Sequence, residues 1–144
     1  MKRHQAAWIF VLLLGALIGS AAASADLDIR RGGSPWARID ADGWIRVGGS
    51  LAGRFESDGS VRKDGMLIGS VASDGAIRRD GKLVGSIESD GTVRKGGSLL
   101  GSIESDGTIR KSGSIWGSVD NGCAGPDDLR RVAAVLVFFA GDYF

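Results

Sequence analysis

The sequence contains a single cysteine, a single histidine and only two prolines in 144 residues. One cysteine cannot form an intramolecular disulfide, so the fold must depend on packing and strand pairing. The one histidine, His4, lies in an N-terminal segment that we expect to be removed. The mature chain then lacks the side chain that most often acts as a general base or binds a metal. We therefore expect no enzymatic activity, no catalytic residue, no metal site and no cofactor.

Residues 1–25 are typical of a secretory signal, because Lys2 and Arg3 precede an apolar run that ends in small residues. Cleavage after Ala25 predicts an exported protein, periplasmic or extracellular; the alternative is a chain anchored in a membrane by its uncleaved signal. Cleavage removes two basic residues and no acidic ones, so the net charge changes from +1 to −1. Such a weak charge predicts no nucleic-acid partner. We expect no transmembrane span in the mature chain.

Asp-Gly recurs every sixteen residues, at 42, 58, 74, 90 and 106. Together with a degenerate first unit, these five full repeats define a repeat domain over residues 26–121. Each repeat contains two turn signals, Ser-Asp-Gly and Lys-x-Gly or a variant of it, and so predicts two short strands. We expect both turns to be three-residue loops that end in glycine, because this register sets Ile87 and Leu99 opposite Val93 on one face.

Three columns of apolar residues are predicted to form the core. They are Ile45, Val61, Ile77, Val93 and Ile109; Leu51, Leu67, Leu83, Leu99 and Ile115; and Phe55, Val71, Ile87, Ile103 and Val119. Hairpins this short cannot stand alone in water, so the repeats predict an all-β fold, a closed radial array of short antiparallel hairpins. Gly101, with its repeat equivalents, marks a bend or a close backbone approach.

The repeat pattern S-D-G-x-[IV]-R, with G-x-[IV] after each second turn and an apolar, Phe-rich tail from Val132 to Phe139, resembles the five-fold beta-flower protein family. This resemblance covers most of the mature chain. It implies five hairpin petals around an axis, and it implies no particular biochemical activity. The second turn departs from the family, with Lys-x-Gly or Arg-x-Gly where we expect Asn and Ser, so loop chemistry is not carried over.

Two arrangements of the chain ends stay open. The segment around Val119 lacks a following strand and the segment around Ile29 lacks a preceding one, so the two could pair and close the ring. Alternatively, five full petals surround the axis and the first unit lies outside as a flap. Pro35 and Ala37, which replace leucine and glycine of the repeat, would suit that position.

The last segment, residues 122–144, differs from the repeats in composition. Asp127 and Asp128 suit the start of a helix, and the apolar stretch that follows extends to Phe139. We expect a helix, with a strand as the alternative, packed over one end of the ring as a plug. Cys123 is given no role.

Two sets of residues are candidates for binding. One arginine per repeat forms a possible anion-binding column, although cross-strand pairing with acidic residues explains it more simply. This column contains Arg46, Arg62, Arg78, Arg94 and Arg110. Trp36, Trp44 and Trp116 depart from the repeat and are possible glycan contacts, with capping of the two ends of the array as the simpler interpretation.

These observations predict an exported, non-enzymatic structural or binding module. The alternative is a carbohydrate- or anionic-polymer-binding protein of the bacterial cell envelope. The sequence identifies no partner, and a cell-envelope polymer or a protein is the candidate.

Overall fold

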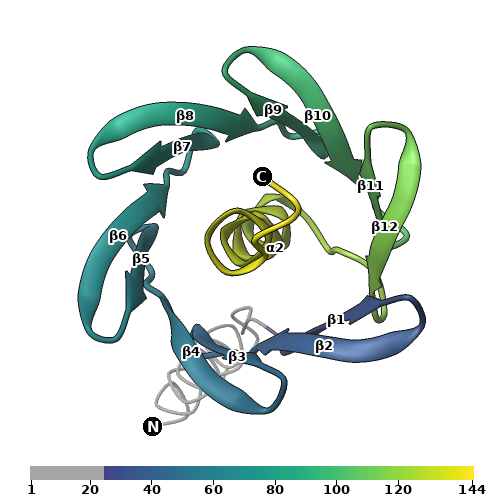
Figure 1. Cartoon of the computed structure of the whole chain (residues 1–144), viewed down its shortest axis with the longest axis horizontal. Helices are drawn as coiled ribbons and strands as arrows, with labels where there is room; N and C mark the ends of the chain where they lie inside the picture. The colour runs from purple at the N-terminus through teal and green to yellow at the C-terminus, as the bar shows by residue number, and fades with distance from the viewer. Residues whose placement is uncertain (1–24) are drawn as a thin grey trace, which may run out of the picture.

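The structure is a computed structural model that describes residues 25–144, so most of the predicted signal lies outside the described residues. Twelve antiparallel strands close into a barrel around one axis, and one helix occupies its centre (Figure 1). The strands are β1 (Leu27–Arg31), β2 (Ser34–Ile39), β3 (Trp44–Val47), β4 (Ser50–Phe55), β5 (Ser60–Lys63), β6 (Met66–Val71), β7 (Ala76–Arg79), β8 (Lys82–Ile87), β9 (Thr92–Lys95), β10 (Ser98–Ile103), β11 (Thr108–Lys111) and β12 (Ser114–Val119). The helix is α2 (Pro126–Phe139). The all-β closed array is confirmed.

The ring contains six hairpins, β1 with β2 through to β11 with β12, rather than the five petals predicted. The degenerate first unit is the sixth hairpin. Ile29 pairs with Val119 and Arg30 with Ser118, so the chain ends close the ring and the first unit is not a flap. The physical reason is that β1 and β12 each have a free edge along the chain, and pairing them satisfies both. Pro35 is accommodated because it lies exposed beside an irregularity in the pairing.

The two turns of each repeat have different lengths. Ser-Asp-Gly is a three-residue turn as predicted, since Ile87 pairs with Val93 and the Glu88 N–H donates to the Thr92 carbonyl at 2.8 Å. The second turn has two residues, not three: Lys95 pairs with Ser98 across Gly96 and Gly97, whose φ angles are 56° and 85°. Positive φ at both positions defines the hairpin turn whose twist matches that of the strands.

This shorter turn places the leucine column on the outer face. Leu99 pairs with Arg94 instead of Val93, and a β-bulge follows before Gly101 pairs with Val93. The predicted core position of this column is therefore wrong, because a slip of one residue turns a side chain to the other face. Its members are 55 to 68% exposed, and they are Leu51, Leu67, Leu83, Leu99 and Ile115. The other two predicted columns are buried.

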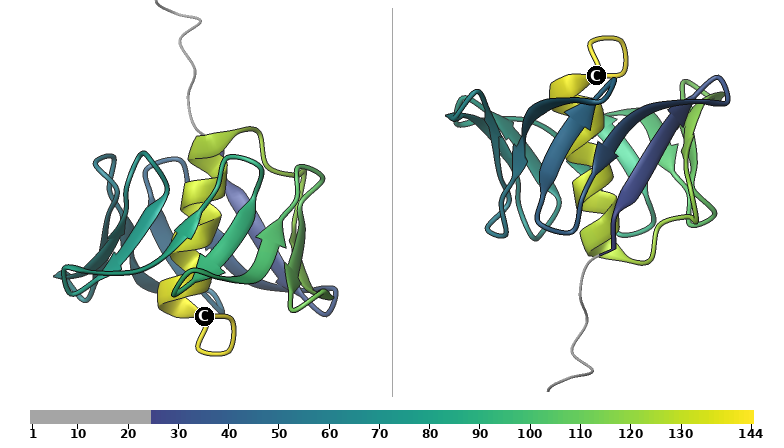
Figure 2. Two further views of the ribbon diagram at one scale, coloured as in Figure 1. Left: turned by 90° about the horizontal axis from the view of Figure 1, so that it is seen from above. Right: turned by 90° about the horizontal axis from the view of Figure 1, so that it is seen from below.

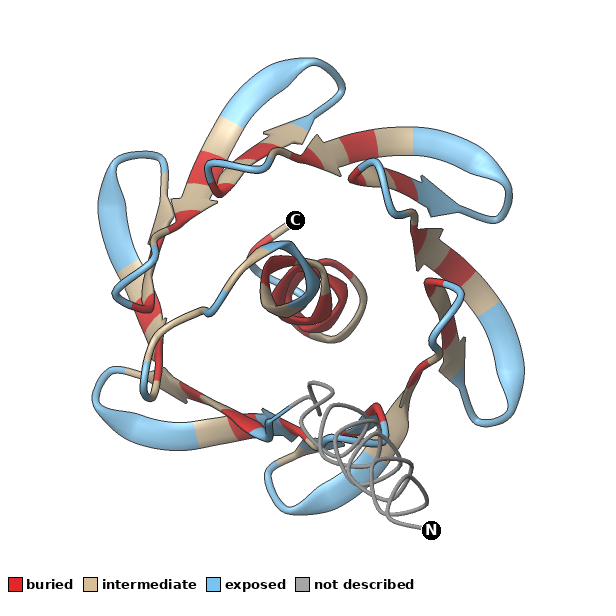
Figure 3. Cartoon of the chain, turned by 180° about the vertical axis from the view of Figure 1, so that it is seen from behind, coloured by how far each residue is buried: buried red, intermediate tan, exposed pale blue. Residues whose placement is uncertain are grey.

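The helix α2 runs along the barrel axis, inside the ring rather than over one end of it (Figures 1 and 2). The prediction of a docked helix is confirmed, but its placement as an end plug is wrong. Seven consecutive residues, 131–137, are buried, so the helix is covered in every direction. In Figure 3 the buried bands lie on the barrel wall and on the helix. A helix that is apolar all round requires such an enclosed position.

The barrel has two different ends. We call the end with the Ser-Asp-Gly turns the narrow end; there α2 begins, and the Arg130 guanidinium donates to the Val71 carbonyl at 2.9 Å. We call the other end the flared end, because its two-residue turns swing away from the axis (Figure 1). The C-terminal residues lie at the flared end, where the Tyr143 hydroxyl donates to the Arg110 carbonyl at 2.9 Å.

The close backbone approach predicted at Gly101 is present. A Cβ atom there would overlap the carbonyl oxygen of Arg110 in the neighbouring strand and lie 2.8 Å from the Tyr143 hydroxyl. Three equivalent glycines are also covered by an aromatic ring from the end of the chain. These pairs are Gly53 with Phe139, Gly69 with Phe138, and Gly85 with Phe144.

Candidate functional site

The predicted arginine column lies on the outer face of the central strands, and ion pairing accounts for most of it. Arg62 pairs with Glu56 at 3.0 Å, Arg94 with Glu88 at 2.5 Å, and Arg110 with Glu104 at 2.7 Å. In the sixth hairpin Arg30 pairs with Asp120 at 2.9 Å. Arg46 and Arg78 are exposed and form no ion pair with any residue that the structure describes.

Each of the five arginines of this column, and Arg30 in the sixth hairpin, ends a short row of three residues that face one another across adjacent strands. Four of the six rows follow one pattern, a small residue, then serine, then arginine. They are Ser60, Ser70 and Arg78; Ala76, Ser86 and Arg94; Thr92, Ser102 and Arg110; and Thr108, Ser118 and Arg30. These four rows show that the fold needs nothing larger than serine at the middle position.

The other two rows carry an arginine in place of the serine. In one, Arg38 is compensated, because its guanidinium binds Asp28 at 2.8 Å in the same row and also binds Asp26. In the other, Arg54 lies between Trp44 and Arg62. We call these three residues the Trp44 row.

Nothing in the Trp44 row neutralises the additional charge of Arg54. Arg54 stands directly opposite Arg62, and like charges at paired positions destabilise a sheet. The Arg54 guanidinium lies over the Trp44 ring at 4.7 Å, while its Nε is buried and has no hydrogen-bond partner among the described residues. A residue that breaks the local pattern at a cost in stability is the expected sign of a functional position.

A cavity of about 220 Å³ lies beside this row, between the second and third hairpins. Besides the three residues of the row, Leu51 and Glu56 line it. Trp44 is 39% exposed and Leu51 is 55% exposed, so both offer apolar surface to solvent. The cavity thus combines an aromatic ring, an aliphatic side chain, two guanidinium groups and the carboxylates of Glu56 and Asp64.

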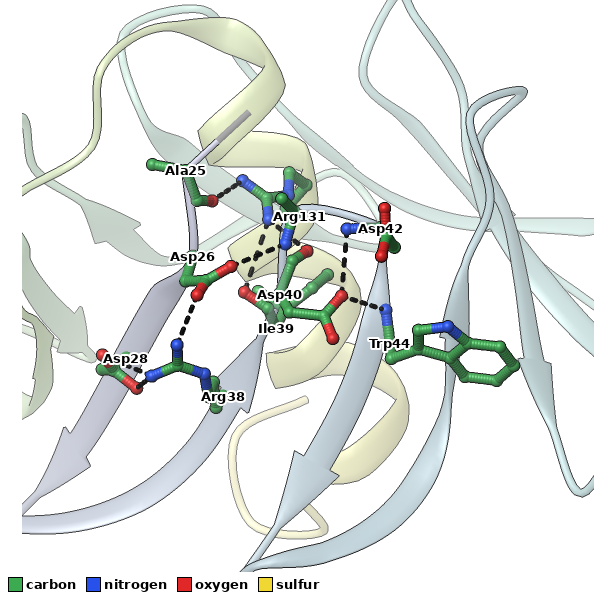
Figure 4. Close-up of polar contacts among 10 residues, drawn as sticks. Ala25, Asp26, Asp28, Arg38, Ile39, Asp40, Asp42, Trp44 and Arg131 are labelled. Carbon is green, nitrogen blue, oxygen red and sulfur yellow. Dashed lines mark hydrogen bonds and ion pairs between the residues drawn. The ribbon is translucent and has the colours of Figure 1, made fainter. Parts of the chain in front are cut away.

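Contacts at the narrow end fix the backbone of Trp44 (Figure 4). One carboxylate oxygen of Asp40 accepts hydrogen bonds from the main-chain N–H groups of Asp42 and Trp44, both at 3.0 Å. The buried Arg131 of α2 donates to the Asp40 carbonyl at 2.7 Å and to the Ala25 carbonyl at 2.8 Å. The start of Trp44's strand is therefore tied to the central helix.

Asp26 belongs to the same group of contacts. The main-chain N–H of Ala41 and the guanidinium of Arg38 lower the pKa of the Asp26 carboxyl. The carboxyl is therefore ionised across the neutral range, where it compensates Arg38.

Trp36 and Trp116 lie elsewhere, on the inner side of the wall where the first and last hairpins meet. Their rings pack edge to face at 5.5 Å, and Trp116 packs in the same way on Tyr143 at 5.3 Å. The Arg31 guanidinium lies 4.1 Å from the Trp116 ring centre. These contacts stabilise the seam of the ring, which agrees with a structural role for both tryptophans.

The structure also places the remaining reactive groups. Burial and the nearby Asp128 raise the pKa of the half-buried Cys123 thiol to about 11, so it stays protonated at neutral pH. In residues 25–144 no three His, Cys, Asp or Glu side chains gather closely enough to hold a metal ion. No described helix has the length and apolar character needed to cross a membrane.

Sequence reasoning identified Trp44 and Arg62 but missed Arg54, the residue that joins them. A signal was present, because the equivalent position in four later half-repeats is serine, at 70, 86, 102 and 118. Comparison with family models, curated proteins and solved structures found no match to this chain. The resemblance to five-fold beta-flower proteins stays a prediction.

Proposed function

We propose that the chain is an exported, non-enzymatic binding module that takes up an anionic glycan of the cell envelope at the Trp44 row. The observation that carries this proposal is the paired departure from the repeat: Trp44 and Arg54 replace a small residue and a serine in the same row, and that row gains no acidic residue. Four other rows have a small residue and a serine at these two positions, so neither the tryptophan nor the arginine is needed for folding.

The chemistry of the row suits an acidic sugar. An exposed indole offers an apolar face for the C–H groups of a sugar ring and a polar N–H at its edge. Guanidinium groups bind carboxylate, sulfate or phosphate through two parallel hydrogen bonds. Arg62 uses its Nε for Glu56, and a guanidinium has five N–H donors. Donors are therefore left for a ligand.

The position of the row on paired strands favours a rigid, preformed binding site. Its three residues lie on paired strands, and a site built on strands is held more precisely than one on loops. The exposed Arg46 on the same strand as Trp44 adds positive charge beside the site. An extended acidic polymer could therefore contact more than one arginine.

Titration calorimetry of the purified mature protein with polygalacturonate, and with dextran as the neutral polymer, tests the proposal. The double variant Trp44→Ala, Arg54→Ser restores the residue types found at Ala76 and Ser86 and is expected to fold. It should weaken polygalacturonate binding at least about tenfold, equivalent to about 1.4 kcal/mol. The matched control Arg110→Gln removes a paired arginine of the same column and should leave binding within about twofold.

Binding should also weaken as salt is added, because the charges are largely exposed. Unchanged affinity of the double variant would contradict the assignment of the site. Absence of binding to any acidic glycan would leave a purely structural role for the module.

A further inference from the structure

The flared end carries a second set of cations, which differs from the predicted arginine column. In five of the six hairpins, the last residue of the first strand is basic and faces the inside of the barrel near the end of α2. These residues form the basic ring: Arg31, Lys63, Arg79, Lys95 and Lys111. The second hairpin has Val47 at this position.

Four members of the basic ring bind oxygen atoms at the end of the chain. The Arg79 guanidinium donates to the Val137 carbonyl at 2.8 Å, and Arg31 binds the Asp142 carboxylate at 2.5 Å. Lys95 and Lys111 donate to the carbonyl oxygens of Phe144 and Asp142.

This arrangement has an electrostatic reason. The last turn of α2 contains no basic residue of its own. Arg79 of β7 therefore supplies positive charge at the C-terminal end of the helix, while the other three cations bind residues that follow it.

Lys63 is the exception in the basic ring. Its ammonium group donates to no oxygen among residues 25–144, and the side chain is exposed. It lies at a cavity of about 420 Å³ between the barrel wall and the C-terminal end of α2. The other lining residues are mostly apolar: Val47, Ala52, Arg79, Val137, Phe138, Phe139, Ala140, Gly141 and Phe144.

One lining position carries a smaller side chain than its equivalents in the other hairpins. The position of Ala52 in the second hairpin corresponds to one partly buried apolar residue in each of the other five, and all six pack toward the core. The residues are Trp36, Ala52, Ile68, Val84, Leu100 and Trp116. In the first and last hairpins a tryptophan side chain fills the space beside the helix, and the ring of Trp116 contacts Tyr143 there. Alanine leaves that space open.

We propose that this cavity binds a free acyl carboxylate, with the hydrocarbon chain against the phenylalanines and the carboxylate on Lys63. The side chains of Phe138, Phe139 and Phe144 account for the hydrocarbon chain, because burying hydrocarbon is favourable in proportion to its area. Arg79 donates to the Val137 carbonyl and so offsets part of the negative end of α2, whereas the other three cations bind Asp142 and Phe144 beyond the helix. The cavity lies at the flared end and shares only Ala52 with the lining of the cavity beside the Trp44 row, so this binding does not use the three residues of that row.

Titration calorimetry of the full mature protein with decanoate and hexanoate tests this inference. Decanoate should bind at least about tenfold more tightly than hexanoate, since each additional buried CH₂ contributes about two- to fourfold. Lys63→Gln should weaken decanoate binding by about fivefold or more, because it removes the cation that meets the carboxylate. Lys82→Gln, on an exposed lysine outside the cavity, is the matched control and should have no effect.

Ala52→Trp is the decisive variant, because it places in the cavity the residue that the first and last hairpins carry at this position. It should abolish decanoate binding while thermal unfolding shows an intact fold. If Trp fails to fold, Ala52→Leu, which matches Leu100, should weaken decanoate binding at least about tenfold.

Two results would overturn the inference: decanoate binding to Ala52→Trp as tightly as to the wild type, or no decanoate binding at all. In the second case the protein is also mixed with phosphatidylglycerol vesicles. If it sediments with the vesicles although free decanoate does not bind, the ligand is a membrane surface and the inference is wrong. The Trp44→Ala, Arg54→Ser variant should bind decanoate normally, so failure of the glycan proposal and failure of this one are distinguishable.

Discussion

The chain reverses in different ways at the two ends of the barrel: two-residue turns close each hairpin at the flared end, and three-residue turns join neighbouring hairpins at the narrow end. At the narrow end a three-residue turn is held by an aspartate, as in Asp90, whose carboxylate accepts from the Thr92 N–H at 3.0 Å. At the flared end two residues with positive φ make the turn, and a β-bulge follows. The difference decides which side chains are buried, because the bulge turns Leu99 outward while Val93 stays inside.

The comparison shows that turn length controls burial as strongly as hydrophobicity does. Toward the narrow end, Ile103 pairs with Ile109 and both are buried against the helix side. Toward the flared end, the equally apolar Ile115 is 67% exposed. The β-bulge and Gly101 form the junction between the part of the hairpin with buried apolar side chains and the part with exposed ones.

The largest effect is expected at this junction, for Gly101→Val. A β-branched side chain would overlap the Arg110 carbonyl, which cannot move without breaking the pairing of β10 with β11. We expect a loss of more than about 3 kcal/mol in the free energy of unfolding, measured by denaturant titration. Ser102→Val, one residue further on and on the outer face, is the control and should change it by less than about 1 kcal/mol.

The substitutions Ile109→Ala and Ile115→Ala, at the two ends of one hairpin, should lower the free energy of unfolding by different amounts. Both losses are expected to be smaller than or similar to that of Gly101→Val. Ile109 is fully buried, so its truncation should cost about 2 to 4 kcal/mol of unfolding free energy. Ile115 is largely exposed, and the same change there should stay within about 0.5 kcal/mol. Denaturant titration of both variants measures this, and equal losses would show that the leucine column is buried after all.

The two turns can be compared directly through Gly91→Ala and Gly97→Ala. Both glycines have positive φ, 92° and 85°, so both substitutions strain the backbone by about 1 kcal/mol or more. At Gly91 a Cβ would also overlap the Ile103 carbonyl, whereas at Gly97 nothing lies within 4 Å. Gly91→Ala should therefore lower the melting temperature clearly more than Gly97→Ala, and the reverse order would contradict the assigned turns.

The smallest expected effect is a change in the pH dependence of stability, caused by aspartates at the narrow end. Main-chain N–H groups of Ser60, Thr92 and Thr108 hold the pKa values of Asp58, Asp90 and Asp106 below their ordinary value. A pKa lowered by folding gives stability above the unfolded value, about 4, which is lost as the pH falls through the folded value.

The melting temperature should accordingly decrease from about pH 4 downward. The triple variant Asp58→Asn, Asp90→Asn, Asp106→Asn should decrease less steeply in thermal unfolding at the same pH values. An identical slope would show that other carboxyls cause the acid sensitivity.

Much of this fold follows from local sequence signals. Asp-Gly spacing gave the repeat, the strands and the three-residue turn, because aspartate and glycine each have a defined role in that turn. The two-residue turn was not recognised, since Gly-Gly suits both lengths and the apparent alignment of Leu99 with Val93 favoured the wrong one. The hairpin count depended on whether a degenerate unit pairs with the last strand, which is a long-range contact that no local signal decides.

The candidate site was predictable in part. Trp44 was visible as a departure from the repeat and Arg62 as a member of a column. Their common row with Arg54 depends on cross-strand register, which only the structure provides. The basic ring was missed because Lys63 and its equivalents were read as turn residues, whereas they end the strands and face the helix.

The closure of the ring by its first and last hairpins has a consequence for the order of folding. Hairpin contacts join residues close in sequence, but the pair of Arg30 and Asp120 spans 90 residues. Contacts this distant form slowly, because a long loop must be closed first. The helix that fills the barrel follows all twelve strands in the chain, so the wall emerges before its filling does. Until α2 arrives, the inner surfaces face water, and β1 and β12 have free edges until they pair with each other. The period between synthesis of β12 and insertion of α2 is then the time at which this protein is most exposed to aggregation.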